Sequence, residues 1–318
     1  MASMARSGET VLLRSLAAHP AIFVPGQIDK RDDPAGRALI EKVQREGVNE
    51  LDREDPCVSD CGIAPTCEAI VVKQGVWEHR WPFDGFILVR NPASVYRSLT
   101  AFDRFRLSGD YLASQLKRLA AKTGLGRGTA NVDNRARLRN WANDIDDDLA
   151  DLVPRVDLTT AICAFYNRRM LALHETGLPV LHYERFVADP EASLRQVLAR
   201  LGLPFDPAVL WAHEEYEAGQ KGHGRADLSA PIHAGSMEKY REIGRRRFDR
   251  ICALTLPTWQ RFGYRMSWDA IDIDPAFQDG FGSGADDSYA GEPASAESAS
   301  ESTPSDTGTA ALDLSASS

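Results

Sequence analysis

The chain has 318 residues with 43% hydrophobic and 26% charged side chains, which is ordinary for a globular protein. Residues 269–318 hold eleven of the 46 Asp and Glu and none of the 37 Lys and Arg, so the net charge of -9 becomes about +2 for residues 1–268. This balance suits an anionic small ligand and excludes an extended nucleic-acid surface. No apolar run approaches the ~20 residues of a membrane span and no signal peptide opens the sequence, so we expect a cytoplasmic protein.

The first predicted element is a helix that begins near Thr10, at the end of the turn Arg6-Ser7-Gly8-Glu9-Thr10. A glycine-containing turn that opens a helix leaves backbone N–H groups free to bind an anion. Arg6 adds a positive charge and Ser7 a hydroxyl donor, so the turn predicts a phosphate site. Taken alone, the same residues are equally typical of a simple helix cap. The Walker pattern G-x-x-x-x-G-K-[ST] is absent, which disfavours an ordinary kinase or ATPase.

Short apolar runs predict the strands of a parallel sheet. They cover residues 69–72, 85–89 and 180–183, and runs of this kind are typical of strands buried on both faces. The alternation of strands and helices predicts an α/β fold in three layers, with a central parallel sheet between helices. Helices are expected to start near Thr10, Pro92, Asp157, Pro190 and Pro207.

Two stretches depart from this alternation. Residues 104–150 form a charge-rich insertion whose acidic run 144–148 is interpreted as a solvated helical face. Residues 269–318 are rich in Ser, Ala, Gly and Asp, so we expect one domain over residues 1–268 followed by an acidic disordered tail. Three cysteines between residues 57 and 67 lack an obvious fourth zinc ligand, which favours thiols over a metal site or a disulfide.

A second motif follows the strand predicted at residues 85–89. Arg90 ends the strand, Asn91-Pro92 opens a helix, and Ser98 lies about two helical turns beyond Arg90. Ligands of open α/β sheets bind at the carboxyl edge of the strands, and arginine makes forked contacts to phosphate. The layout therefore predicts that Arg90 and Ser98 hold one phosphate group.

Together the two motifs resemble those of the sulfotransferase family that uses 3′-phosphoadenosine 5′-phosphosulfate (PAPS). In that family a [KR]-S-G-x-T turn holds the 5′-phosphosulfate, and a strand-end R-[ND]-P holds the 3′-phosphate together with a Ser spaced as Ser98 is from Arg90. Residues 182–191 and 201–205 resemble its Y-E-x-x-x-x-D-P and L-G-L-P-F segments. The resemblance covers roughly residues 5–265 and implies a P-loop nucleoside-triphosphatase-like fold. Because only residues 1–5 precede the turn, the first strand is expected to be truncated, either because it is vestigial or because the true start of the sequence lies upstream.

The resemblance also implies which residues bind the donor nucleotide, with no metal expected. Two of them belong to a late basic loop that the family closes over the 3′-phosphate, although a solvated surface loop is an equal alternative. Glu9 departs from the family's small hydroxyl residue, and its carboxylate would repel a phosphosulfate at close range. The expected donor-binding residues are Arg6, Ser7, Gly8, Glu9, Thr10, Val11, Arg90, Ser98, Lys221 and Arg225.

Sulfuryl transfer places charge on the leaving phosphate and on the sulfuryl oxygens, so it needs fixed positive groups there. Arg6 and Lys73, which ends the strand predicted at residues 69–72, are the expected catalytic cations. The acceptor hydroxyl also needs a base to take its proton. The sequence has neither the His nor the Glu of the family at its usual position, which leaves Glu78 and His79 as candidates.

The leading interpretation is an enzyme that moves a sulfuryl group from PAPS to a hydroxyl of a glycan or other small molecule. A non-catalytic nucleotide-binding relative is the second, since Glu9, the missing base and the short first strand all favour it. A P-loop kinase of small molecules is the third. No nucleic-acid partner and no membrane span are expected, and the oligomeric state stays open.

Overall fold

The computed structural model describes residues 1–25, 34–48, 50–52, 54–55, 58, 61–73, 85–106, 138–139, 142, 146–220 and 227–281. These residues belong to a compact unit that runs from Met1 to Gly282. None of the described helices is long and apolar enough to cross a membrane.

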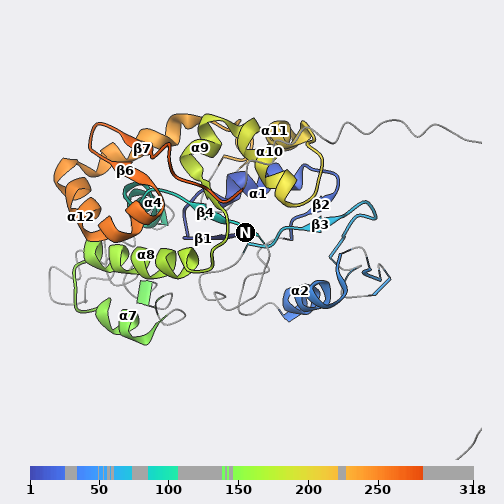
Figure 1. Ribbon diagram of the computed structural model, residues 1–318, viewed down its shortest axis with the longest axis horizontal. Coiled ribbons are helices and arrows are strands. Elements are labelled where there is room, and N and C mark those ends of the chain that lie inside the picture. Colours follow the sequence, from blue (N-terminus) through green and yellow to red (C-terminus); the bar gives the residue numbers. More distant parts are fainter. Residues whose placement is uncertain are drawn as a thin grey trace, which may run out of the picture. The chain divides into compact units, whose positions relative to one another are not determined.

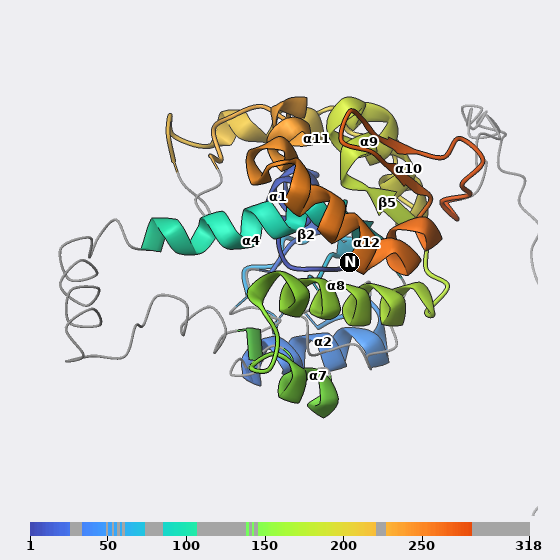
Figure 2. The ribbon, with the colours of Figure 1, turned by 90° about the vertical axis from the view of Figure 1, so that its left-hand side faces the viewer.

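A parallel sheet lies at the centre of this unit, with its strands in the order β1-β4-β5. Figure 1 labels β1 and β4, and Figure 2 labels β5. β1 (Ala2–Ser3) pairs with β4 (Ile87–Val89), and β4 pairs with β5 (Val180–His182). β2 (Ile22–Phe23) and β3 (Ala69–Ile70) form a second parallel pair. The predicted parallel strands are therefore confirmed, although β3, β4 and β5 are each shorter than the apolar runs that predicted them.

The first strand was expected to be truncated, and it is present as the two residues Ala2–Ser3. On one side β1 pairs with β4, while on the other side the Met1 nitrogen donates to the Val72 carbonyl at 2.9 Å. β1 thus lies between β4 and the residues that follow β3. This short strand leads directly into the turn that precedes the first helix.

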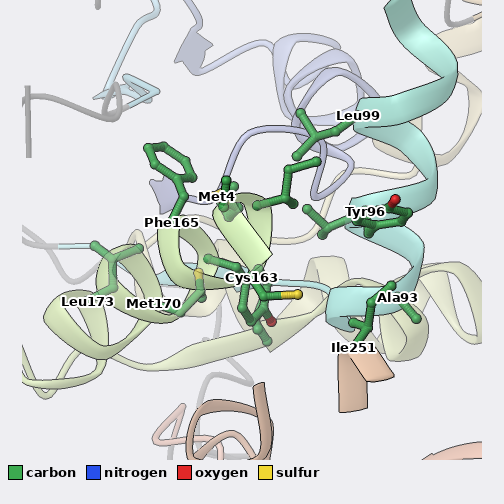
Figure 3. Close-up of a cluster of buried hydrophobic side chains, with 14 of the residues drawn as sticks. Met4, Ala93, Tyr96, Leu99, Cys163, Phe165, Met170, Leu173 and Ile251 are labelled. Carbon is green, nitrogen blue, oxygen red and sulfur yellow. The ribbon is translucent and has the colours of Figure 1, made fainter. Parts of the chain in front are cut away.

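Successive residues of a strand point to opposite faces of a sheet. The side chains of β4 therefore enter two apolar cores, one on each face. Ile87 and Val89 pack in one core with α4 (Pro92–Arg106), α8 (Leu158–His174) and α12 (Arg245–Arg261). Figure 3 shows part of this core, where residues of α8 lie beside Met4 and the residues of α4.

The second core lies on the opposite face of the sheet. There Leu88 packs with Leu12 and Leu16 of α1 (Glu9–Ala17) and with Leu194 of α10 (Pro190–Arg200). The two helical layers around one sheet confirm the predicted three-layer α/β fold.

The five predicted helix starts are confirmed to within one residue, and local capping explains two of them. The Asp157 side chain accepts from Thr159 N at 3.0 Å before α8, and Asp189 accepts from Ala192 N at 3.0 Å before α10. Such side-chain caps satisfy N–H groups that a helix leaves without partners. The other described elements are α2 (Pro34–Glu46), α7 (Asp147–Leu152), α9 (Tyr183–Ala188), α11 (Ala208–Trp211), the 3-10 helices η1 (Ala212–Glu215) and η3 (Ala234–Ile243), β6 (Tyr264–Met266) and β7 (Ile271–Ile273).

The compact unit extends beyond residue 268, where the sequence predicted its end. β7 pairs antiparallel with β6 in register Tyr264↔Ile273, and Val180 N donates to Asp279 O at 2.6 Å. These contacts tie residues 271–279 to the α/β unit, although their composition suggested a tail. The remainder of the predicted tail, residues 282–318, lies outside the described residues.

Candidate functional site

A cavity of about 620 Å³ lies where the turn before α1, the start of α4 and the segment 227–239 meet. Its volume is within the ~300–1,000 Å³ typical of small-molecule sites. The described turn and strand-end motifs both line it, through Arg6, Gly8, Arg90 and Ser98. The cavity therefore joins two motifs that the sequence places far apart.

The turn before α1 has an unusual backbone. Arg6 has φ of 77°, the only positive value among the described residues other than glycine, and Gly8 has φ of 104°. Gly8 caps α1 without a side-chain hydrogen bond. The intrahelical bonds of α1 begin with Val11 N, which donates to Gly8 O at 3.1 Å. The N–H groups before it have no carbonyl to bond within the helix, so the turn presents donors and the positive end of the helix dipole to the cavity.

Arg90 lies at the carboxyl end of β4, and the protein holds it in place from several sides. Its Nη1 donates to Arg6 O at 3.3 Å and its Nη2 to Ser236 O at 3.2 Å. The guanidinium carbon lies 4.3 Å from the centre of the Tyr183 ring. Arg90 is 8% exposed, and its Nε has no hydrogen-bond partner among the described residues. A buried donor without a partner indicates a position for an anionic group.

The side chains of Arg6 and Ser98 meet in this cavity. Arg6 Nε donates to Ser98 Oγ at 3.0 Å, although the two residues lie 92 positions apart in the sequence. Ser94, one turn earlier on α4, also lines the cavity; it is 1% exposed, and its Oγ has no hydrogen-bond partner within the described part of the chain. Hydroxyls and guanidinium groups thus converge at the start of α4, as phosphate binding requires.

Glu9 is turned inward at the first position of α1. It is 7% exposed, and its Oε1 accepts from Ser3 Oγ at 3.1 Å. Lys73 Nζ lies 3.9 Å from the same oxygen. The structure therefore brings Lys73, which follows β3, beside the predicted phosphate turn, and it places a positive charge next to the carboxylate that the sequence marked as a departure.

The Asn91 turn after β4 is held by the buried carboxylate of Glu184, which belongs to the Y-E-x-x-x-x-D-P segment but whose contact with this turn the sequence did not predict. Glu184 Oε1 accepts from Asn91 N at 3.1 Å and from Asn91 Nδ2 at 2.6 Å. Its Oε2 accepts from Tyr264 OH at 2.6 Å. Burial, together with the nearby Glu184 carboxylate, raises the pKa of Tyr264 well above its ordinary value, so the phenol stays a donor. These bonds fix the backbone that carries Arg90.

Arg14 holds the segment of residues 227–232, which forms one wall of the cavity. Its Nη1 donates to Leu228 O at 2.5 Å and to Ala230 O at 2.9 Å, and it is 6% exposed. Burial lowers the pKa of Arg14, an effect that nearby Tyr216 and Asp227 oppose. The sequence offered no signal for this role, since an arginine inside a helix is usually a surface residue.

Several predicted residues are placed in the structure, and others fall outside it. Thr10 and Val11 line the cavity, and Ser7 is fully buried. The described residues contain no group of three or more His, Cys, Asp or Glu that could hold a metal ion. Four predicted site residues lie outside the described residues, namely Glu78, His79, Lys221 and Arg225.

No family model matches the chain, and no curated protein matches it. Among solved structures, it is similar to the sulfotransferase domain of the Synechococcus PCC 7002 olefin synthase, with 18% identity and a TM-score of 0.45 over 84% of this chain and 94% of that one. It is also similar to the sulfotransferase domain of the curacin biosynthetic pathway, with 17% identity and a TM-score of 0.41 over 79% of this chain and 94% of that one.

Proposed function

We propose that this protein is a sulfotransferase that moves a sulfuryl group from PAPS to a hydroxyl of a glycan or other small molecule. The observation that carries the proposal is the contact between Arg6 Nε and Ser98 Oγ at 3.0 Å. Arg6 belongs to the turn expected to bind the 5′-phosphosulfate, and Ser98 to the motif expected to bind the 3′-phosphate. One cavity that holds both motifs fits a nucleotide with an anionic group on each side of its ribose.

The donor would bind with its 5′-phosphosulfate at the N-terminus of α1. There the free N–H groups of the first turn and the Arg6 guanidinium offset its negative charge. Its 3′-phosphate would lie against Arg90, Ser94 and Ser98. The Arg90 Nε and the Ser94 Oγ, both without partners among the described residues, supply the donors that this phosphate needs.

In the transfer step, the acceptor oxygen attacks sulfur while the bond from sulfur to the phosphate oxygen breaks. Charge then develops on the leaving phosphate and around the sulfuryl oxygens. Arg6 and Lys73 would stabilise that charge from the turn and from the end of β3. Their fixed positions would replace the solvent reorganisation that the uncatalysed reaction needs.

The first test compares nucleotides by thermal shift. Adenosine 3′,5′-bisphosphate should raise the unfolding temperature of the protein, whereas ATP should raise it far less, because a linear triphosphate leaves the 3′-phosphate position empty. The reverse preference would favour a small-molecule kinase. Radioactive sulfate transfer from labelled PAPS to a panel of phenolic and glycan acceptors then separates an enzyme from a non-catalytic relative, which would bind the bisphosphate and transfer nothing.

A further inference from the structure

The proposed reaction needs a general base, and three described residues lining the cavity carry a carboxylate or an imidazole, the groups that most often take this role. They are Glu9, Asp227 and His233. Asp227 Oδ1 is engaged in its own loop, where it accepts from Ser229 N at 3.1 Å and from Ser229 Oγ at 2.7 Å.

His233 is also committed to local structure. Its Nδ1 accepts from Gly235 N at 3.1 Å and caps η3, and the residue is exposed. Glu9 differs from both, because it belongs to the phosphate turn itself. Its position at the start of α1 sets it beside the place where the sulfuryl group of a donor would lie.

We propose that Glu9 is the general base of this protein and that Lys73 and Ser3 orient its carboxylate toward the acceptor hydroxyl. The proposal rests on the proposed sulfotransferase function. Ser3 Oγ donates to Oε1 at 3.1 Å, and Lys73 Nζ lies 3.9 Å from the same atom. Neither contact involves Oε2, which is left to accept the proton.

The step balances in atoms and charge. The acceptor oxygen gives its proton to Glu9 and forms a bond to sulfur, while sulfur loses its bond to the 5′-phosphate oxygen. The products are a sulfate monoester and adenosine 3′,5′-bisphosphate, and Glu9 afterwards releases the proton to water. Before transfer, the negative carboxylate of Glu9 repels the negative phosphosulfate. Proton uptake neutralises the carboxylate, so this repulsion is lost during transfer.

Lys73 has a second effect on this arrangement. Its ammonium lies beside the Glu9 carboxylate, and a cation there weakens the repulsion between this carboxylate and the negative phosphosulfate of the donor. Glu9 also shares its cavity with Arg6 of the turn and with Arg90 at the end of β4. The Lys73 ammonium, which follows β3, therefore offsets part of the cost of burying the Glu9 carboxylate.

The test compares Glu9→Gln with Glu9→Asp and with the wild-type protein, using labelled PAPS and the best acceptor of the panel. Glu9→Gln keeps the shape and an oxygen that accepts from Ser3, but it cannot take the proton. We expect turnover to fall by about 10²–10⁴-fold and the acid limb of the pH profile to disappear. Affinity for adenosine 3′,5′-bisphosphate should be unchanged or higher. Glu9→Asp keeps a carboxylate, so it should keep the acid limb at a reduced rate.

Glu191→Gln is the matched control, since Glu191 is an exposed carboxylate of α10 that pairs with Arg195 away from the cavity. It should turn over like the wild type. If Glu9→Gln binds the bisphosphate, folds normally and still turns over within a few-fold of the wild type with its acid limb intact, the assignment of Glu9 is wrong while the sulfotransferase function stands. If the wild-type protein transfers no sulfuryl group to any acceptor, the proposed function itself fails.

Discussion

Gly8 and Tyr183 are in direct contact across the cavity. A Cβ atom added to Gly8 would lie 2.2 Å from Cδ2 of the Tyr183 ring, and Gly8 also has φ of 104°. The same ring lies under the Arg90 guanidinium, and its hydroxyl is 2.7 Å from Ser236 Oγ. One aromatic ring therefore packs against both the phosphate turn, at Gly8, and the arginine at the end of β4.

Gly8→Ala tests this spacing. The substitution adds left-handed backbone strain and forces the ring of Tyr183 to move, so we expect a loss of about 2–4 kcal/mol in the free energy of unfolding. Binding of adenosine 3′,5′-bisphosphate should fall at least tenfold, because Arg90 moves with the ring. Urea unfolding and calorimetric titration measure the two effects.

Gly177→Ala is the control for backbone strain alone. Gly177 has φ of 68°, but nothing lies within 4 Å of its added Cβ. It should cost about 1–2 kcal/mol and leave nucleotide binding unchanged. Equal losses of binding in the two variants would contradict a role for the contact with Tyr183.

Arg90→Lys tests the predicted 3′-phosphate site. Lysine keeps the positive charge but loses the planar fork that reaches Arg6 O and Ser236 O, and it has no Nε to offer the ligand. We expect the Kd for adenosine 3′,5′-bisphosphate to rise by about 10–100-fold, as for the loss of a charged hydrogen bond. Adenosine 5′-monophosphate, which lacks the 3′-phosphate, should bind both proteins alike. Arg245→Lys on the exposed start of α12 is the control, and a similar loss for both nucleotides would count against the assignment.

Glu184→Gln tests the hydrogen bonds by which Glu184 holds the turn after β4. The amide can serve Asn91 or Tyr264 as an acceptor but not both, so one buried donor loses its partner. We expect the free energy of unfolding to fall by about 1–3 kcal/mol, measured by urea unfolding. The exposed Glu175→Gln at the end of α8 should change it by less than about 0.5 kcal/mol. Unchanged stability in Glu184→Gln would show that the hydrogen bonds of Glu184 contribute little to the free energy of unfolding.

Arg14→Met tests the wall formed by residues 227–232. Methionine fills much of the volume of the arginine stem but cannot donate to Leu228 O and Ala230 O. We expect faster amide exchange in residues 228–232 and a several-fold weaker affinity for adenosine 3′,5′-bisphosphate. Arg195→Met on the exposed face of α10 should leave both unchanged. Unaltered exchange in Arg14→Met would mean that other contacts hold this wall.

The sequence predicted the sheet and the helix starts because each rests on local chemistry. An apolar run specifies a buried strand, and a proline or a capping aspartate such as Asp157 specifies a helix start. The end of the compact unit was predicted too early. Ile271–Ile273 is a strand of only three residues, too short to give a recognisable apolar pattern, and it is identified only by its pairing with β6.

The long-range contacts of the site could not be predicted in the same way. Nothing near Glu9 in the sequence indicates that Lys73 lies 3.9 Å away, and nothing near Arg14 indicates its bonds to Leu228 and Ala230. Such pairs form only when separate strands and loops meet at one edge of the sheet. The sequence could mark Glu9 as a departure, but only the fold shows which charge faces it.

The hydrogen bond from Arg6 to Ser98 has a consequence for how the two phosphate ends of a nucleotide bind. Arg6 is expected to bind the 5′-phosphosulfate of the donor and Ser98 its 3′-phosphate, yet the two side chains are hydrogen-bonded to each other in the described structure. Ser98 Oγ accepts from Arg6 and can still donate its hydroxyl proton to a phosphate, so this bond links the two expected phosphate positions and the two halves of the ligand should bind cooperatively. Adenosine 3′,5′-bisphosphate should then bind more tightly than the separate affinities of the 3′- and 5′-monophosphates predict.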